Sequence, residues 1–501
     1  MPPAARFVLD PAFVVGDVDP RLFGSFVEHL GRCVYTGLYE PGHPSADADG
    51  VRTDVLELVR ELGVTAIRYP GGNFVSGYDW EDGVGPKEQR PRRLDPAWRS
   101  TETNQFGLSE FMRFVGKVDG AEPMLAVNLG TRGVREAVQL LEYANHPGGT
   151  TRADERIAHG DQDPYGVRLW CLGNEMDGPW QIGHKDADEY GKLAAATAWA
   201  MRLIDPDVRL VACGSSAQFM PTFGTWESTV LQHTYDLVDY ISMHAYYEEK
   251  DGDRDSFLAS AVDTESFIEN VVATCDHVGA RLKSKKRIAI SFDEWNVWYS
   301  SRPDPELRDW QEAPRLLEDV YTVTDAVVFG SLLIALLRHA DRVRLACLAQ
   351  LVNVIAPIMT EPGGPAWRQT TFFPFAQASA YGRGRVLQVN VDSPTYPTAK
   401  FGDVPLVQAT AVTDDTTGAV TVFAVNRSQS DPLPLEIVLR GFEGLTDVVE
   451  HSALTDPDPD PRNTLDQPER VTPDAAEGTV LDGAVLRATL PALSWNMIRL
   501  V

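Results

Sequence analysis

The sequence predicts an α/β protein: a (β/α)8 barrel of the TIM type with a C-terminal antiparallel β-sandwich, jelly-roll-like and completed by N-terminal strands. Two observations predict the barrel. Short apolar runs alternate with helical patterns from about residue 20 to 355, and eight such runs occur. A third observation predicts the sandwich, because after about residue 385 the helical patterns stop and residues alternate between apolar and polar. The 501 residues are enough for both parts.

The barrel strands are predicted from apolar, β-branched runs. They cover residues 21–30, 64–70, 123–130, 167–175, 208–214, 238–247, 287–296 and 343–353. Helical periodicity occupies 51–63, 190–205 and 264–282. The most apolar stretch, 326–343, contains Arg338, His339 and Asp341, which indicates a buried helix and not a membrane span. A doubly wound open sheet is the alternative, but it usually has a Gly-rich phosphate turn after its first strand, and none is present.

We predict two domains. The catalytic barrel covers residues 18–384, and the β-sandwich combines residues 1–17 with 385–501. The opening segment RFVLDPAFVVGDVD reads as strand, so we expect it to pair with the C-terminal sheets. The segments 409–428 and 434–444 alternate apolar and polar residues, and 455–463 (TDPDPDPRN) is predicted to be a polar, Pro-rich surface loop.

Composition excludes several classes of partner. A net charge of −27 disfavours nucleic acid and polyanionic substrates and suits a neutral one. The N-terminus lacks the pattern of a secretory signal, and no uncharged apolar run reaches about 18 residues, so we expect a cytoplasmic protein without a membrane partner. The cysteines lack CxxC spacing and mostly lie in apolar runs, which indicates buried thiols in a reducing compartment. They are Cys33, Cys171, Cys213, Cys275 and Cys347.

Polar side chains end seven of the eight predicted strands. In a βα barrel these C-terminal strand ends form the floor of the active site. One strand-end carboxylate alone could be a helix N-cap, but this convergence predicts a catalytic cleft. The residues in question are Glu28, His29, Arg68, Asn73, Asn128, Asn174, Glu175, His244, Tyr246, Asp293, Glu294, Trp295, Asn296, Gln350 and Asn353.

Two of these carboxylates, Glu175 and Glu294, follow the fourth and seventh strands, on opposite sides of an eight-stranded ring. Paired carboxylates are the minimum equipment for glycoside hydrolysis. A metal site is the competing use, but the sequence lacks HxH and HExxH, so we predict no metal and no other cofactor. A GxSxG elbow is absent, as is a phosphate cradle for a nucleotide-sugar transferase.

Five blocks in the right order resemble the α-L-arabinofuranosidases of glycoside hydrolase family 51, a family of the large retaining (β/α)8 glycosidase clan. They are FGSFVEHLGRCVYTGLYE, RYPGGNFVSGYDWEDGVGP, CLGNEMDGPWQIGH, FDEWNVWY and LAQLVNVIAPIMTEPGGPAWRQTTFFPF. The resemblance covers essentially the whole chain, including the sandwich. Relatives often carry a His two residues after Trp298, where this sequence has Ser300.

The resemblance implies an exo-acting, retaining enzyme that releases terminal non-reducing α-L-arabinofuranosyl residues from arabinan, arabinoxylan or their oligosaccharides. It also implies a homohexamer, which composition does not show. Two alternatives stay open. The same machinery could act on β-xylosidic or β-glucosidic bonds, or the chain could be a non-catalytic carbohydrate-binding protein, although both glutamates are present. Retention requires the carboxyl groups about 5–5.5 Å apart, against ~6.5–9.5 Å for inversion.

The resemblance also implies roles for individual residues. Glu175 is the expected general acid/base and Glu294 the nucleophile, and Asn174 is expected to bond the sugar 2-hydroxyl. Arg68 and Tyr246 would hold Glu294 ionised, whereas Trp180 would favour the protonated form of Glu175.

The remaining candidates have two uses each. Glu28, Asn73 and Gln350 match positions that bond furanose hydroxyls, or they stabilise loops. Arg68 could also be a structural ion-pair partner, and His244 either tunes a catalytic carboxylate or is a satisfied polar group at the barrel rim. Trp98 and Trp298 are the expected walls of the sugar pocket, although Trp98 could be a packing residue. Strand alternation predicts that Asp293 points away from the cleft, outside the catalytic set.

Overall fold

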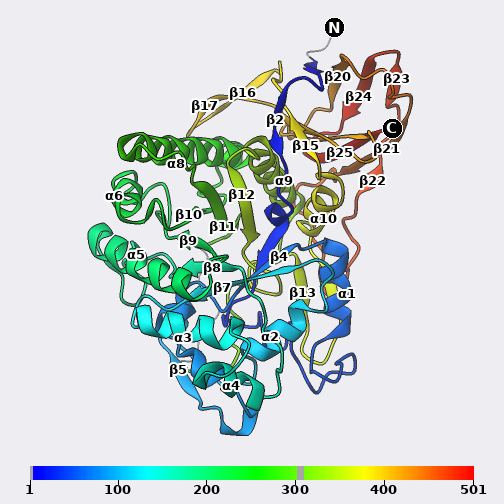
Figure 1. Ribbon diagram of the computed structural model, residues 1–501. Helices are drawn as coiled ribbons and strands as arrows, with labels where there is room; N and C mark the ends of the chain where they lie inside the picture. Colours follow the sequence, from blue (N-terminus) through cyan, green and yellow to red (C-terminus); the bar gives the residue numbers. More distant parts are fainter. Residues whose placement is uncertain (1–3, 302–309) are drawn as a thin grey trace.

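The computed structural model describes residues 4–301 and 310–501. A closed barrel of eight parallel strands forms its centre, in the order β10-β11-β12-β3-β4-β7-β8-β9 (Figure 1). The strands are β3 (Gly24–Phe26), β4 (Ala66–Tyr69), β7 (Glu122–Val127), β8 (Leu169–Leu172), β9 (Arg209–Ala212), β10 (Tyr240–Tyr247), β11 (Ala289–Val297) and β12 (Val343–Leu348). All eight predicted strands are confirmed; β10 and β11 carry the polar residues at the end of their runs within the strand, and β4 carries Arg68, whereas in the other runs these residues follow the strand in the loop.

Helices follow every barrel strand and cover the outside of the ring. In chain order they are α1 (Thr53–Leu62), α2 (Leu108–Val115), α3 (Val134–Asn145), α4 (Thr151–Ala158), α5 (Ala187–Ile204), α6 (Thr225–Thr234), α7 (Arg254–Leu258), α8 (Ser260–Leu282), α9 (Val323–Arg338) and α10 (Phe372–Tyr381). Four 3-10 helices, η1 to η4, span Pro20–Phe23, Asn73–Gly77, Trp80–Gly83 and Lys87–Gln89.

Helix α1 shows how the sequence sets these elements. Its buried residues Val55, Leu58, Val59 and Leu62 recur at helical spacing and face the barrel. The helix stops at Gly63, which adopts φ 76° and donates its N–H to the last carbonyls. A glycine reaches this left-handed conformation without the strain that a side chain would cause.

Helix α9 differs because the β-sandwich covers its outer side. Every residue from Val323 to Leu337 is buried, as its apolar sequence predicted. On the sandwich side, a Cβ on Gly330 would lie 2.3 Å from the ring of Trp495, so only a glycine permits this close packing. The barrel and the sandwich therefore share a continuous apolar core across α9.

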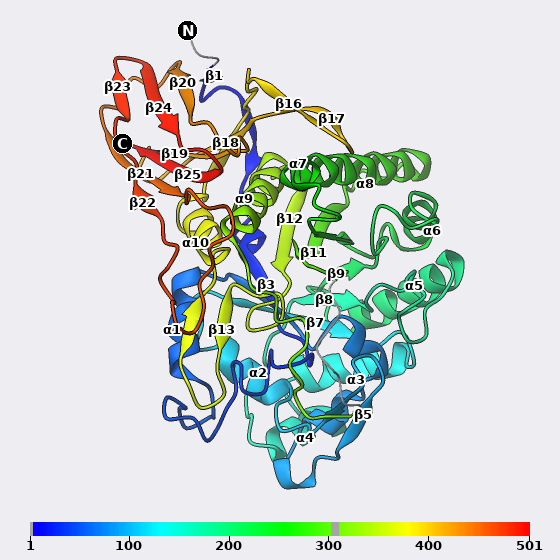
Figure 2. The same cartoon turned by 180° about the vertical axis from the view of Figure 1, so that it is seen from behind.

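The C-terminal region forms two facing sheets, seen beside the barrel in Figures 1 and 2. A seven-stranded sheet has the order β2-β15-β18-β19-β25-β21-β22, and a four-stranded sheet has the order β1-β20-β24-β23. Their strands are β1 (Ala5–Leu9), β2 (Val14–Asp17), β15 (Arg385–Leu387), β18 (Val407–Thr413), β19 (Val420–Asn426), β20 (Leu433–Leu439), β21 (Val448–Leu454), β22 (Asp474–Ala475), β23 (Val480–Asp482), β24 (Val485–Leu490) and β25 (Ser494–Leu500).

The N-terminal strands complete this sandwich, as predicted. Strand β2 pairs antiparallel with β15, and β1 pairs with β20. The second pairing is parallel, with Ala5 opposite Leu435, so the sandwich is not antiparallel throughout. The domain boundaries at residues 18 and 384 stay a prediction.

Three two-stranded antiparallel ribbons lie outside these sheets. They are β5 (Arg93–Asp95) with β6 (Ser100–Glu102), β13 (Ile358–Thr360) with β14 (Ala366–Arg368), and β16 (Thr395–Thr398) with β17 (Gly402–Pro405). The first carries Trp98 in its turn. The third reaches from the sandwich over α7, where both views show it beside the barrel (Figures 1 and 2).

Candidate active site

Glu175 lies just beyond β8, where the chain turns sharply. Gly173 has φ 94° and Glu175 itself has φ 42°, so both adopt left-handed backbone conformations. For a residue with a side chain this conformation costs on the order of 1–3 kcal/mol, and it persists only where the surroundings impose it. In CLGNEMDGPW the apolar strand therefore gives way to polar residues because the turn that follows it presents the carboxylate of Glu175 to the open end of the barrel.

Asp293 and Glu294 lie near the end of β11, and both turn inward. The pairing of β11 with β12 shifts register between Phe292 and Trp295, which breaks the strict alternation of side chains. The prediction that Asp293 points away from the cleft is therefore wrong. Its carboxylate is buried beneath the active site, 3.1 Å from Nε2 of His244 and 3.8 Å from Nε of Arg68.

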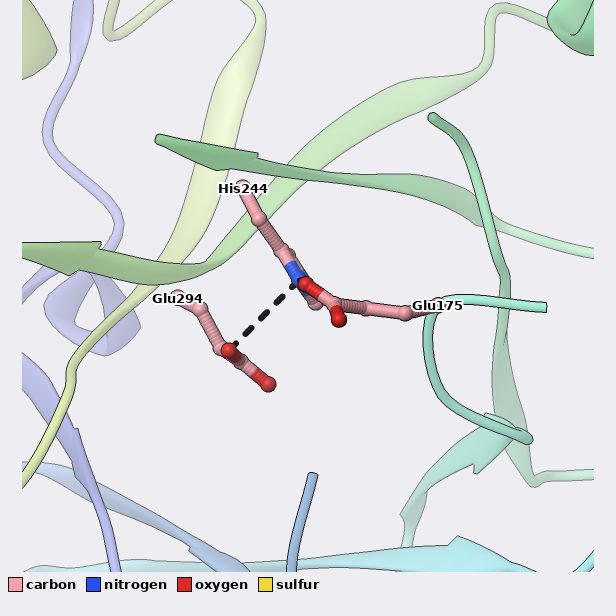
Figure 3. A group of neighbouring side chains, drawn as sticks. All are labelled: Glu175, His244 and Glu294. Carbon is pink, nitrogen blue, oxygen red and sulfur yellow. Dashed lines mark hydrogen bonds and ion pairs between the residues drawn. The ribbon is translucent and has the colours of Figure 1, made fainter. Parts of the chain in front are cut away.

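The carboxylates of Glu175 and Glu294 approach each other closely. One oxygen from each, together with a nitrogen of His244, forms a group whose atoms lie within 4.8 Å of one another. Strands β9 and β10 separate β8 from β11 in the ring, so the two glutamates face each other obliquely across the cleft. Figure 3 shows His244 beside both carboxylates.

Two donors hold Glu294. Nη1 of Arg68 donates to its Oε1 at 2.6 Å, and the hydroxyl of Tyr246 donates to its Oε2 at 2.7 Å. Nη2 of Arg68 donates to Oδ1 of Asn174 at 2.6 Å, so one guanidinium orients two polar residues. Burial opposes the charge of Arg68, but Asp293 and Glu294 outweigh it and raise the pKa of Arg68. The donors expected to keep Glu294 ionised are thus present.

His244 bridges the carboxylates. Its Nδ1–H donates to Oε1 of Glu175 at 2.8 Å, and its Nε2–H donates to Oδ1 of Asp293 at 3.1 Å. Burial alone would lower the pKa of His244, but the charges of Glu294, Asp293 and Glu175 raise it to about 10. The ring is therefore an imidazolium at neutral pH. Of the two predicted uses, the geometry favours contact with a catalytic carboxylate.

Trp180 contacts the other oxygen of Glu175. Its indole N–H donates to Oε2 at 2.6 Å, while its ring is 47% exposed. We expected apolar burial of Glu175 by Trp180, and the structure instead gives a hydrogen bond. Both oxygens of Glu175 accordingly accept from neighbouring donors.

A cavity of about 1010 Å³ opens above these residues. All the predicted site residues line it except Arg68, which donates to Glu294, and Asn174, which accepts from Arg68. Its lining includes Glu28, Asn73, Trp98, Glu175, His244, Tyr246, Glu294, Trp298 and Gln350.

Glu28 is held by three hydrogen bonds in this lining. Its Oε1 accepts from the backbone N–H of Phe74 and from the indole of Trp98, both at 3.0 Å, and its Oε2 accepts from Gln350 at 3.0 Å. Burial raises the pKa of Glu28 to about 8, against the effect of these donors. The polar partner of Trp98 favours a site role for this residue over simple packing.

Gly71 and Gly72, which have no side chains, let the turn before Asn73 pass close to Glu28 and Glu294. A Cβ on Gly71 would lie 2.8 Å from Cγ of Glu28, and one on Gly72 would lie 3.0 Å from Oε1 of Glu294. Any larger residue at Gly71 would displace Glu28 from its donors. Asn73 follows directly and lines the cavity.

The group of Glu175, His244 and Glu294 also has spacing that could hold a metal ion. Both ring nitrogens of His244 already contact carboxylates, and as an imidazolium the ring has no lone pair to offer. The donor set therefore suits proton transfer better than metal binding. The expectation of no metal and no cofactor stays a prediction.

Known proteins match both halves of the chain. A family model described as "Alpha-L-arabinofuranosidase 1 domain" matches residues 58–263, and one described as "Alpha-L-arabinofuranosidase C-terminal domain" matches residues 293–494. An intracellular exo-α-(1→5)-L-arabinofuranosidase of Streptomyces lividans is 74% identical over 498 residues, which is 99% of this chain and 75% of that protein. An exo-α-(1→6)-L-arabinofuranosidase of Bifidobacterium longum is 57% identical, over 99% of this chain and 97% of that one.

A solved structure agrees with these relatives. AbfB, a family 51 α-L-arabinofuranosidase from Bifidobacterium longum, superimposes with a TM-score of 0.96 at 49% identity, over 100% of both chains. The chain belongs to the α-L-arabinofuranosidases of glycoside hydrolase family 51. As a member of this family it is a glycoside hydrolase that releases arabinofuranosyl groups, and the resemblance noted in the sequence is confirmed.

Two further findings concern membrane-spanning helices and the cysteines. Within residues 4–301 and 310–501, no helix combines the length and apolarity that crossing a membrane requires. The five cysteines are free and buried, as the apolar context of most of them predicted.

Sequence reasoning missed several parts of the arabinofuranosidase site. Asp293 was misplaced because the strand irregularity has no sequence signal, and the donor role of Trp180 depends on the turn after Glu175. Phe26, whose ring centroid lies 4.6 Å below the Arg68 guanidinium, resembles any core residue of a strand. Leu317 and Ile355 also line the cavity, and both lie in long loops that carry no periodic pattern.

Proposed function

We propose that this enzyme is an exo-acting hydrolase that removes terminal non-reducing α-L-arabinofuranosyl residues with retention of configuration, by double displacement. The observation that carries the proposal is the proximity of Glu175 and Glu294, since one carboxylate oxygen of each lies within 4.8 Å of the other. This proximity supports the separation of retaining enzymes, whose carboxyl groups are about 5–5.5 Å apart, over the ~6.5–9.5 Å that inversion needs for a water between them.

Charge balance supports the assignment of roles. The cations Arg68 and His244 face three carboxylates, those of Glu175, Asp293 and Glu294. A cation beside a carboxylate favours its ionised form. Arg68 contacts Asp293 and Glu294, and the charges of Arg68 and His244 lower the pKa of Asp293 against its burial. Arg68 donates to Glu294, the carboxylate that must attack as an anion, so we assign Glu294 as the nucleophile and Glu175 as the general acid/base.

The first step follows from these positions. A carboxylate oxygen of Glu294 bonds to the anomeric carbon while the bond to the leaving oxygen breaks, and Glu175 gives its proton to that oxygen. The leaving alcohol departs neutral, and the arabinosyl group remains as an ester of Glu294. Glu175, now ionised, is stabilised by the imidazolium of His244 and by the indole N–H of Trp180.

The second step reverses these roles. Glu175 takes a proton from water, the water oxygen bonds to the anomeric carbon, and the bond to Glu294 breaks. Two displacements on the same carbon give an α-configured product. Glu294 returns to its hydrogen bonds with Arg68 and Tyr246, and Glu175 is protonated again for the next cycle.

The furanosyl ring has a well-defined site in this proposal. Glu28, Asn73 and Gln350 offer hydrogen-bonding groups on the side of the cavity formed after β3, β4 and β12, and Trp98 and Trp298 supply aromatic walls. Asn174 is held by Arg68, and we assign it to the sugar 2-hydroxyl next to the reacting carbon. The substrate is neutral, in keeping with a net charge of −27.

Three finer assignments rest on relatives. The 74% identical Streptomyces lividans protein is named for α-(1→5) bonds and for an intracellular place, so we propose the same bond and compartment here. The Bifidobacterium longum relative named for α-(1→6) bonds marks that linkage as the main competitor. By resemblance we propose a homohexamer, and a light-scattering mass near the 55.2 kDa of one chain would refute it.

Proton NMR of the first minutes of hydrolysis tests the proposal. With an α-(1→5)-linked arabinobiose the first arabinose released is the α-furanose, which only later equilibrates. An initial β-furanose would mean inversion and overturn the mechanism. A parallel set of aryl α-L-arabinofuranoside, β-D-xyloside and β-D-glucoside tests the sugar, and we expect hydrolysis of the first to exceed the others by orders of magnitude.

A further inference from the structure

The cavity continues well beyond the two glutamates. Its volume of about 1010 Å³ is at the upper end of the ~300–1,000 Å³ typical of ligand sites, more than one furanosyl ring fills. The part on the other side of the cleft from Glu28 is lined from three segments: the loop after β10, α7 with its N-cap, and the β16–β17 hairpin of the sandwich. We call this part the distal compartment and define it by Lys250, Asp253, Ser256, Lys400 and Phe401.

Barrel topology puts the distal compartment on the leaving-group side. Glu28, Asn73 and Gln350 follow β3, β4 and β12, which are neighbours in the ring. The distal compartment lies beyond β10, past Glu175 and His244. Because the acid/base protonates the leaving oxygen, the rest of an oligosaccharide must extend from Glu175 away from the furanosyl site.

The hairpin is fixed where it meets the barrel. The hydroxyl of Tyr396 donates to the carbonyl of Asp255 at 3.2 Å, and the backbone N–H of Lys400 donates to Oγ of Ser256 at 3.1 Å. Gln429, which also belongs to the sandwich, donates to the carboxylate of Asp255 at 2.8 Å. Figure 2 shows β16 and β17 above α7. The sandwich therefore contributes a positioned wall to the cavity.

This wall has the chemistry of a sugar site. Phe401 is half-buried and lines the cavity, with the ammonium of Lys400 5.0 Å from its ring centroid. Around it Lys250, Lys400 and Asp253 provide charged donors and acceptors for hydroxyl groups. An apolar ring face beside a few convergent polar groups is typical of carbohydrate recognition.

We propose that the distal compartment binds the arabinosyl units of the leaving group farthest from the scissile bond, so that the sandwich domain takes part in selecting oligosaccharides over short substrates. This inference rests on the proposed function, since it uses the direction of the leaving group set by Glu175. It assigns to Phe401 a stacking contact and to Lys400 and Asp253 hydrogen bonds with sugar hydroxyls.

Chain-length dependence tests this inference. The measured quantity is the ratio of kcat/KM for α-(1→5)-arabinotetraose to kcat/KM for p-nitrophenyl α-L-arabinofuranoside, which has no arabinosyl unit in its leaving group. We expect Phe401→Ala to lower this ratio roughly three- to tenfold through the lost stacking contact. Phe401→Trp keeps an aromatic face and should retain most of the ratio. Phe13→Ala, in an exposed sandwich residue outside the cavity, is the matched control and should leave the ratio unchanged.

An unchanged ratio in Phe401→Ala would overturn the inference. An equal fall of kcat/KM for both substrates also leaves the ratio unchanged and would indicate a purely structural role. If Phe401→Ala and Phe401→Trp lower the ratio equally, the aromatic ring does not stack on a sugar and this contact is refuted. Failure of the wild-type enzyme to hydrolyse either substrate would instead contradict the proposed function, so the two failures are distinguishable.

Discussion

Nδ1 of His244 lies 2.8 Å from Oε1 of Glu175, and the same nitrogen lies 3.6 Å from Oε2 of Glu294. One charged ring therefore contacts both carboxylates of the reaction. The charges of Glu294, Asp293 and Glu175 maintain its positive charge, and Asp293 holds the ring from behind through Nε2. We assign His244 and Asp293 as positioning residues.

The first prediction concerns His244→Gln, which keeps a hydrogen-bond donor and removes the charge. The variant lacks the imidazolium, whose pKa is about 10, so the fall of kcat that the loss of this charge causes in the wild type near pH 10 should disappear from the alkaline limb of its pH–rate profile. Deglycosylation slows because the ionised Glu175 loses its partner, and kcat falls on the order of 10- to 100-fold. The measurement is kcat from pH 4 to 10. His451→Gln, in a buried sandwich histidine, is the control, and an unmoved alkaline limb in His244→Gln would refute this role.

The second prediction concerns the two hydrogen bonds that the guanidinium of Arg68 donates, one to Glu294 and one to Asn174. Arg68→Lys retains a charge but cannot donate to Glu294 and Asn174 at once, so kcat/KM falls on the order of 100-fold. Arg156→Lys is a matched control, because Arg156 is equally buried and its guanidinium donates to backbone carbonyls far from the cavity. We expect it to lower the melting temperature without a comparable loss of kcat/KM. Equal kinetic losses in both variants would show that Arg68 acts only through stability.

The third prediction uses the pKa of Glu28, which burial raises from 4.5 to about 8. Between these values the unfolded chain releases the Glu28 proton and the folded enzyme keeps it, so a rise in pH favours unfolding. The glutamine of Glu28→Gln does not ionise, so the free energy of unfolding of this variant does not decrease for this reason as the pH rises. Relative to wild type, its free energy of unfolding should gain at most about 1.4 kcal/mol per pH unit between pH 4.5 and 8, then level off. Urea titrations at several pH values measure this difference, and a difference independent of pH would contradict it.

The barrel could be predicted because its strands are buried on both sides, which leaves long apolar runs bounded by helical patterns. The strand ends could be predicted for a related reason, since polar residues such as Glu175 and Glu294 interrupt those runs where the cleft begins. The position of Asp293 could not, because it depends on a register shift between β11 and β12 that the residues themselves do not encode.

The sandwich shows a similar division. Its strands were visible as alternation, but β18 and β19 are buried on both faces, because α9 covers the side that alternation assigns to solvent. Thr410 and Thr421 are among the polar residues of that pattern, and both are buried. Contacts between distant segments, such as the hairpin β16–β17 on α7 or the parallel direction in which β1 pairs with β20, depend on tertiary packing and have no local pattern in the sequence.

The roles of the two glutamates are the centre of this account, and azide rescue tests them most directly. The experiment measures turnover of an activated aryl α-L-arabinofuranoside by Glu175→Ala and Glu294→Ala, with and without azide, and determines the configuration of the azide product. We predict that Glu175→Ala still forms the glycosyl-enzyme, because an aryl leaving group needs no proton, and that azide then restores turnover with a product of retained configuration. Glu294→Ala should give no retained product, since no group remains to form the ester. Rescue of Glu294→Ala with retention, while Glu175→Ala stays inert to the activated substrate, would exchange the two roles and contradict the assignment.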